Sequence, residues 1–125
     1  MQKINEDKSI YVTRGDAIAF DVTATEDGVR YKFKAGDVLR FKVAEKKGCD
    51  CVMLQKDFPV EAETDKVQVW LTGEEMKFGD VISKPKDYWY EVELNPETVP
   101  QTIIGYDEDG PKIMKLFPEG KDVRE

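Results

Sequence analysis

Two glutamates, Glu91 and Glu93, stand two positions apart, so both side chains fall on one face of an extended strand. Converging carboxylates can act as an acid and base pair, as in glycosidases, when a cleft gives them unequal pKa values. On a chain with 36% charged residues, a solvated face paired with lysines of the next strand is the simpler interpretation. That interpretation is favoured, and a small hydrolase using this pair is the alternative.

The remaining residue types argue against a metal or nucleophilic centre. The chain has no histidine and only two cysteines, Cys49 and Cys51. Two thiolates cannot supply the four ligands of a structural zinc site, and the histidine-dependent triads are excluded. A disulfide across one residue would be strained, so both cysteines are predicted to be reduced. No metal and no cofactor are predicted.

Two short motifs have simple structural explanations. The acidic run Asp107–Gly110 lacks the alternating acids of a calcium loop, so it predicts a hairpin turn between strands Gln101–Tyr106 and Lys112–Phe117. Arg14-Gly15-Asp16 has the letters of an integrin-recognised tripeptide. Glycine and aspartate at a strand junction predict a tight turn there.

Three aromatic residues are the candidates for interaction: Trp70, Trp89 and Tyr106. Each tryptophan falls on the polar side of its predicted strand. A tryptophan on an exposed sheet face can stack on a sugar or anchor a protein interface. Coverage of the ring by a loop or by the N-terminal tail is the structural alternative.

The strongest structural signal is the segment Tyr88–Leu94. Its residues alternate strictly, with Tyr88, Tyr90, Val92 and Leu94 on one side and Trp89, Glu91 and Glu93 on the other. Such a two-residue period predicts a strand that lies on a core. The other strands are expected to pack against it.

Short strands separated by turn residues follow one another along the rest of the chain. A capping box at Thr72–Glu75 predicts one helical turn through Met76–Phe78. In the predicted strand Val29–Phe33, the side chains of Val29, Tyr31 and Phe33 are expected on one side. The pattern predicts an all-β fold, an antiparallel immunoglobulin-like β-sandwich of about 7–9 strands in a single domain, with polar tails at 1–8 and 120–125. The predicted strands are Ser9–Thr13, Ala17–Thr23, Val29–Phe33, Val38–Ala44, Cys51–Phe58, Lys66–Thr72, Tyr88–Leu94, Gln101–Tyr106 and Lys112–Phe117.

Charge and hydropathy exclude several partners. The net charge of −7 disfavours nonspecific binding to nucleic acid, which needs a basic surface, and adsorption to an anionic membrane. No apolar run is long enough to cross a membrane. The first residues lack the apolar core of a signal peptide, so synthesis in the cytoplasm is expected.

A family resemblance adds to this interpretation. Thr13–Asp16 followed by an alternating strand resembles the opening of N-terminal domains of baseplate upper proteins from tailed phages of Gram-positive bacteria, an opening that small prophage proteins of gut Firmicutes share. The segments Tyr88–Leu94, Gln101–Tyr106 and Lys112–Gly120 are similar to the end of those proteins. The similarity spans most of residues 9–120, although baseplate upper proteins continue into long helical and receptor-binding regions.

The resemblance implies an immunoglobulin-like domain with a structural or docking role in a virion tail or baseplate and without enzymatic activity. Its expected partners are other virion proteins or further copies of this chain, and its expected location is the virion if the phage is functional. A carbohydrate-binding module that uses Trp70, Trp89 or Tyr106 is the alternative function.

Overall fold

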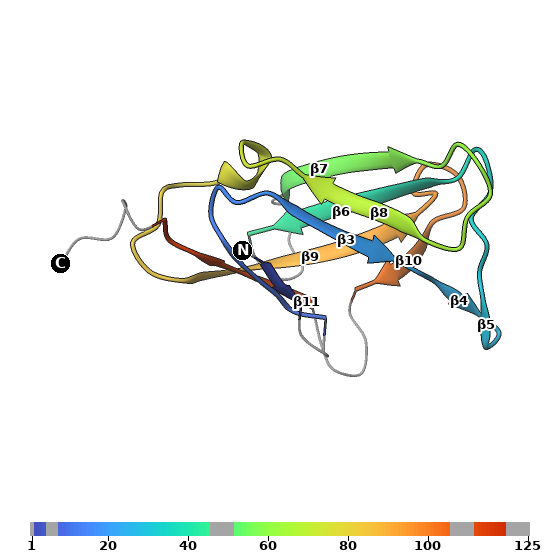
Figure 1. Cartoon of the computed structure of the whole chain (residues 1–125), viewed down its shortest axis with the longest axis horizontal. Helices are drawn as coiled ribbons and strands as arrows, with labels where there is room; N and C mark the ends of the chain where they lie inside the picture. Colours follow the sequence, from blue (N-terminus) through green and yellow to red (C-terminus); the bar gives the residue numbers. More distant parts are fainter. Residues whose placement is uncertain (1, 5–7, 46–51, 106–111, 120–125) are drawn as a thin grey trace.

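The computed structural model describes the chain except for residues 1, 5–7, 46–51, 106–111 and 120–125. The described residues form eleven strands and one 3₁₀ turn (Figure 1). These elements are β1 (Gln2–Ile4), β2 (Ile10–Thr13), β3 (Ile18–Val22), β4 (Thr25–Glu26), β5 (Val29–Arg30), β6 (Val38–Ala44), β7 (Val52–Pro59), β8 (Val67–Leu71), η1 (Glu75–Lys77), β9 (Lys86–Leu94), β10 (Gln101–Ile104) and β11 (Lys112–Phe117).

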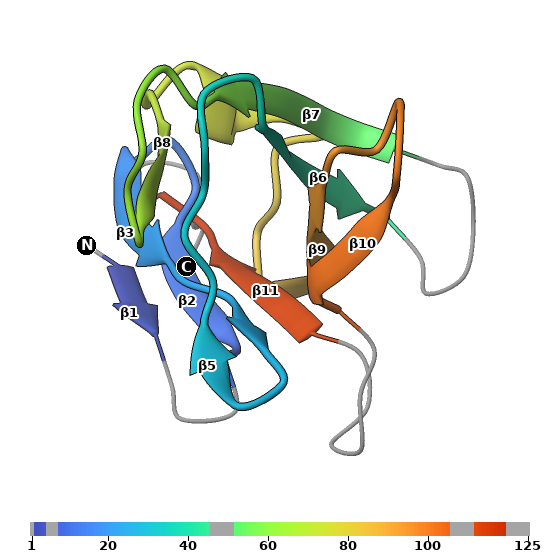
Figure 2. The same cartoon turned by 90° about the vertical axis from the view of Figure 1, so that its right-hand side faces the viewer.

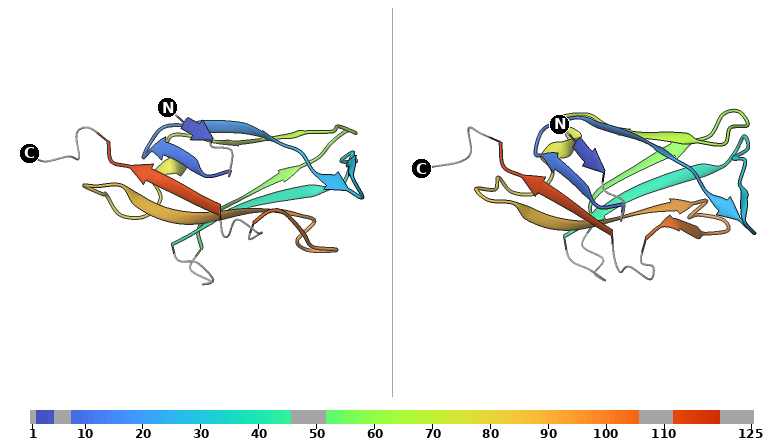
Figure 3. Two further views of the ribbon diagram at one scale, coloured as in Figure 1. Left: turned by 90° about the horizontal axis from the view of Figure 1, so that it is seen from below. Right: turned by 60° about the horizontal axis from the view of Figure 1, so that its bottom comes forward.

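The strands form two layers of unequal width. The large sheet has the order β1-β2-β11-β9-β6-β7, with β10 pairing β9 as well. The small sheet contains β3 and β8, which lie above β9 and β11 in the left view of Figure 3, and β4 and β5 form a separate hairpin. The prediction of an all-β sandwich is confirmed.

The strand predicted to organise the fold, β9, lies in the middle of the large sheet. One of its edges pairs with β6 through Trp89–Leu94. Its other edge pairs first with β11 and then with β10, each of them antiparallel to β9. The four inward side chains predicted for this strand are all buried.

The core fills the space between the two layers. β6 contributes Leu39, Phe41 and Val43, each with no exposed surface. Tilted rings of Phe41 and Tyr90 pack at a centroid distance of 5.7 Å, and Phe20 of β3 meets Phe41 edge-on at 6.1 Å. The contact of Phe20 with Phe41 joins the small sheet to the large one.

The last two strands correct a predicted hairpin. β10 and β11 do not pair with each other; both return along the same edge of β9, one after the other (Figure 2). Turn residues between two β-prone segments predict a local hairpin. Here both segments pair instead with β9, which is nine residues long. The predicted turn Asp107–Gly110 lies outside the described residues.

Three further expectations need correction. Residues 2–4 form the edge strand β1 on β2 instead of belonging to a tail, because main-chain pairing does not require apolar side chains. β2 pairs with β11 in parallel, so the large sheet is not wholly antiparallel. Val29 does not face the core: β5 ends at Arg30, and Val29 is 69% exposed at the tip of the hairpin.

One turn has its usual residues, and one local prediction is confirmed. The turn between β4 and β5 has Asp27 and Gly28 at positive φ, 52° and 78°, as expected of a tight two-residue hairpin. In the capping box, the Thr72 N–H donates to Glu75 Oε1 at 2.8 Å, and the Glu75 N–H donates to Thr72 Oγ1 at 3.2 Å. This reciprocal pair starts η1.

Candidate interaction surface

The outer face of the large sheet carries an apolar cluster that does not belong to the core. We call Tyr11, Trp89, Ile113 and Phe117 the outer-face patch; all four are half-buried, and none packs against the core. Trp89 stands opposite Ile113 in the pairing of β9 and β11. Tyr11 and Phe117 meet edge-on with ring centroids 6.0 Å apart. The predicted outward position of Trp89 is therefore confirmed, and the ring has apolar neighbours.

Charged side chains surround this patch on the same face. Lys115 lies opposite Tyr11 with its Nζ 5.6 Å from the ring centroid, and it forms an ion pair with Asp87 at 3.8 Å. An apolar centre that contains tryptophan and tyrosine within a polar rim is the usual composition of a protein interface.

The two glutamates considered for catalysis, Glu91 and Glu93, both form ion pairs with the side chain of Lys42. Lys42 Nζ lies 3.1 Å from Glu91 Oε1 and 2.6 Å from Glu93 Oε1. Burial lowers the pKa of Lys42, but its hydrogen bonds with Glu93 and Glu91 outweigh that effect and raise the pKa above its usual value. The cross-strand ion pairs agree with the solvated-face interpretation.

A second group of ion pairs lies on the same strand, β6. Arg40 forms ion pairs of 2.8 Å each with Asp57 Oδ1 and Glu97 Oε1. Its hydrogen bond with Asp57 is the main cause of the raised pKa of Arg40 and of the lowered pKa of Asp57. The outward cations of β6 are therefore neutralised within the domain.

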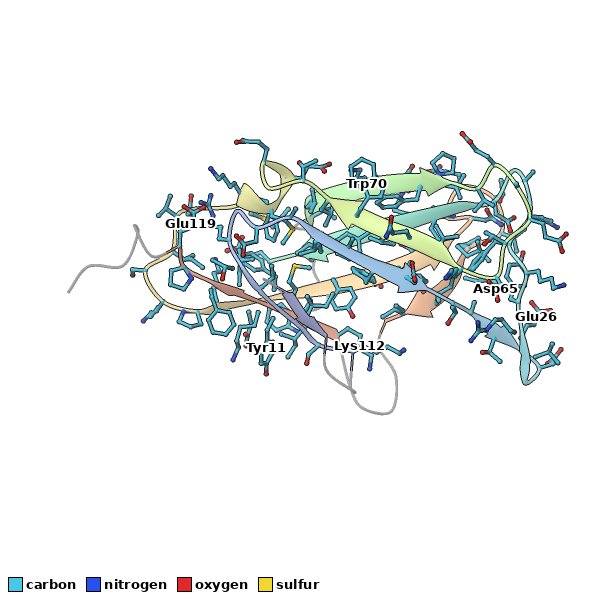
Figure 4. All side chains as sticks on the ribbon, in the orientation of Figure 1. Tyr11, Glu26, Asp65, Trp70, Lys112 and Glu119 are labelled. Atoms are coloured by element: carbon cyan, nitrogen blue, oxygen red, sulfur yellow. The ribbon has the colours of Figure 1, made fainter. Side chains whose placement is uncertain are left out.

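Trp70 lies on the other layer, away from Tyr11 in Figure 4, with 47% of its surface exposed. Lys56 of the edge strand β7 places its Nζ 3.4 Å from the centroid of the Trp70 ring and 2.9 Å from Glu75 Oε1. Phe58 packs edge-on against the same ring at 6.2 Å. The two contacts of Lys56 thus connect β7 with β8 through Trp70 and with η1 through Glu75, where the two layers meet.

We expect Lys56→Met to lower the free energy of unfolding by about 1 kcal/mol, because it removes a cation–π contact and an ion pair but keeps an unbranched apolar side chain. Lys66→Met is the matched control, since Lys66 pairs with Asp21 at 3.9 Å and both side chains are more than half exposed. Urea unfolding followed by tryptophan fluorescence measures both. Equal losses in the two variants would contradict a specific role for Lys56.

The tripeptide Arg14-Gly15-Asp16 is a turn, as predicted. Arg14 is only 7% exposed, and its Nη2 donates to the carbonyl oxygens of Lys77 at 2.7 Å and Gly79 at 3.3 Å. Gly15 has a φ of 91°, which favours glycine. A guanidinium held against the main chain in this way is not displayed to a receptor.

A groove of about 710 Å³ is lined by residues of β10 and of the segment that contains β4. Its lining includes Gln101, Thr102 and Ile103 of β10 and residues 23–27. Lys8, Tyr31 and Leu94 complete it. Sequence patterns did not single out this groove, because it depends on two segments that are far apart in the chain.

Tyr106, Cys49, Cys51 and the acidic run Asp107–Gly110 lie outside the described residues. Among the residues that the structure describes, no group of three or more histidine, cysteine or acidic side chains could hold a metal ion. In the same part of the chain, no helix is long and apolar enough to cross a membrane.

Comparison with known proteins gave no relative: no family model, curated protein or solved structure matches this chain.

Proposed function

We propose that this domain is a non-enzymatic structural or docking module, derived from a phage or prophage, that acts through protein–protein contacts in a tail or baseplate. The outer-face patch carries this proposal, because it gathers three aromatic rings and one aliphatic side chain on a sheet face outside the core. Such residues are enriched at the centres of protein interfaces.

The connectivity supports an immunoglobulin-like arrangement for the module. β3 and β8 lie in one layer, and β6, β9 and β11 lie in the other. Strands B and E, and strands C, F and G, are divided in this way in immunoglobulin domains. This agrees with the fold that the resemblance to baseplate upper proteins implies.

The occupant of the patch that we propose is a second copy of this chain in a symmetric oligomer. Although the chain carries a net charge of −7, the outward charged residues of β6, β7, β9 and β11 nearly balance. Three are cationic and four are anionic: Arg40, Lys42, Lys115, Asp57, Asp87, Glu91 and Glu93. Two copies can therefore approach through this face with little net repulsion, whereas the rest of the surface is acidic.

Sedimentation velocity of the full chain over a range of concentrations tests the proposal. We expect a reversible shift to a discrete oligomer as the concentration rises. A monomer at every concentration up to the millimolar range would contradict self-association through this face. The carbohydrate-binding alternative is tested separately by a glycan array, where no signal at millimolar sugar would remove it.

A further inference from the structure

We infer that the charge of Lys56 closes the open edge of β7 to strand addition, so that copies of this chain do not join edge to edge at this strand. The edge is separate from the outer-face patch, and its state does not depend on the proposed function. Two features of β7 carry this inference: the direction of its main-chain groups, and the side of the sheet on which Lys56 lies.

β7 forms one edge of the large sheet. Its residues Val52–Pro59 pair with β6, and among the described strands none pairs with its other side. An open edge of this length presents a row of main-chain N–H and C=O groups, which is a template for the addition of a strand. A second copy of the chain carries the same edge, so every copy is a potential partner for this pairing.

The amides that point to the open side belong to Gln55 and Asp57. The Val60 N–H donates to the Asp37 carbonyl at 2.8 Å, and in an antiparallel pair such hydrogen-bonded positions alternate with positions that are not hydrogen-bonded. In the register of β6 and β7, Asp57 and Gln55 fall on positions of the second kind. Their N–H groups therefore point away from β6, whereas that of Lys56, between them, points toward it.

The side chain of Lys56 lies on the core side of this edge. It stands opposite Phe41, which is fully buried, and directly opposite residues share one face of a sheet. Its neighbours in the same row of β7 are Leu54 and Phe58, so a cation takes the middle position of an otherwise apolar row. Only 20% of its side-chain surface is exposed. Natural sheets use an inward-pointing charge on an edge strand to prevent edge pairing.

Antiparallel pairing of two β7 strands about a two-fold axis places this cation beside an unsuitable neighbour. Residues of the core-side row must lie opposite one another, because a slip by one residue exchanges the two faces. If residues 53–59 of the two copies pair, Lys56 lies opposite Lys56 of the second copy, and the like charges repel. If residues 52–58 pair, Lys56 lies opposite Leu54 of the second copy. The added strand then covers the ammonium group without giving it a new partner.

Amide hydrogen exchange, measured by NMR over a range of protein concentrations, reports on this edge directly. In the unmodified chain we expect the amides of Gln55 and Asp57 to exchange quickly at every concentration, because contact through the outer-face patch leaves this edge open. Lys56→Met removes the charge. We expect it to form a concentration-dependent dimer in which these two amides exchange about tenfold more slowly or less quickly still.

Four further variants separate the charge from other effects. Lys56→Gln is also neutral and can still donate to Glu75, so we expect the same dimer even if Lys56→Met does not fold. Lys56→Arg keeps the charge, and Lys66→Met removes a lysine outside β7; both are expected to behave as the unmodified chain does. Gln55→Pro, added to Lys56→Met, removes one outward N–H group and is expected to abolish the edge dimer.

Fast exchange of both amides in Lys56→Met and Lys56→Gln at every concentration would overturn the inference. Concentration-dependent protection of the two amides in the unmodified chain would show that the edge is open, with the same consequence. An edge dimer of Lys56→Arg would show that the charge is not the cause. A dimer that persists after Gln55→Pro is added would show that it does not form through this edge, and would likewise overturn the inference.

Discussion

Trp89→Ala is expected to weaken self-association by about 2 kcal/mol or more, which is roughly a 30-fold rise in the dissociation constant, and to leave the fold intact. Trp89 lies at the centre of the outer face, opposite Ile113 on one side and Ala44 on the other. It does not pack against the core, so its removal leaves no cavity there. Sedimentation velocity measures the association, and urea unfolding measures the stability.

Trp70→Ala is the matched control for this prediction. It also removes one outward tryptophan, but from β8 in the other layer, where the ring is 47% exposed and contacts Lys56. We expect it to lower stability modestly and to leave association unchanged. Equal loss of association in both variants would contradict an interface on the outer face, and unfolding of Trp89→Ala would show that this ring belongs to the core.

Asp37→Ala is expected to lower the free energy of unfolding by about 3 kcal/mol or more, because it leaves several donors without an acceptor. Asp37 is 3% exposed and accepts hydrogen bonds at Oδ2 from the Tyr31 hydroxyl and the Lys34 N–H, each at 3.0 Å. Its Oδ1 accepts a hydrogen bond from Asn95 Nδ2 at 3.2 Å. Asn95 in turn accepts from the Val38 N–H, so the network fixes the start of β6.

The carboxyl group of Asp37 is also expected to make the free energy of unfolding depend on pH. Burial raises the pKa of Asp37, but hydrogen bonds from Lys34, Asn95 and Tyr31 outweigh that effect and lower it below its usual value. The folded state therefore favours the ionised form, so its contribution to stability is present above the ordinary carboxyl pKa. It is lost as the pH falls from about 4 through the lower pKa of the folded state.

Two variants separate this contribution from that of other acids. In Asp37→Asn we expect lower stability at neutral pH and a smaller loss between pH 5 and pH 2 than in the unmodified chain. Asp57→Ala removes an exposed partner of Arg40 and is expected to cost about 1 kcal/mol at most. Thermal and urea unfolding at several pH values give these numbers. An unchanged acid dependence in Asp37→Asn would refute the role of this network.

The sequence predicted the sheet interior well, because β6 and β9 alternate strictly between apolar and polar residues. The same alternation placed Trp89 on the outer face and could have identified Ile113 and Phe117 beside it. The pairing of both β10 and β11 with β9 was missed. Turn residues indicate only a local preference for a turn and do not identify the partner strand. The contact of Lys56 with Trp70 and the groove beside β10 depend on segments that meet only in the folded chain.

The measurement that most directly tests a structural role in a virion is immunogold electron microscopy of particles released from an induced culture of the organism that encodes this chain. The antibody is raised against the purified domain, and particles treated with pre-immune serum serve as the control. We predict that gold clusters at the tail or baseplate. Intact particles without gold would contradict the proposed role.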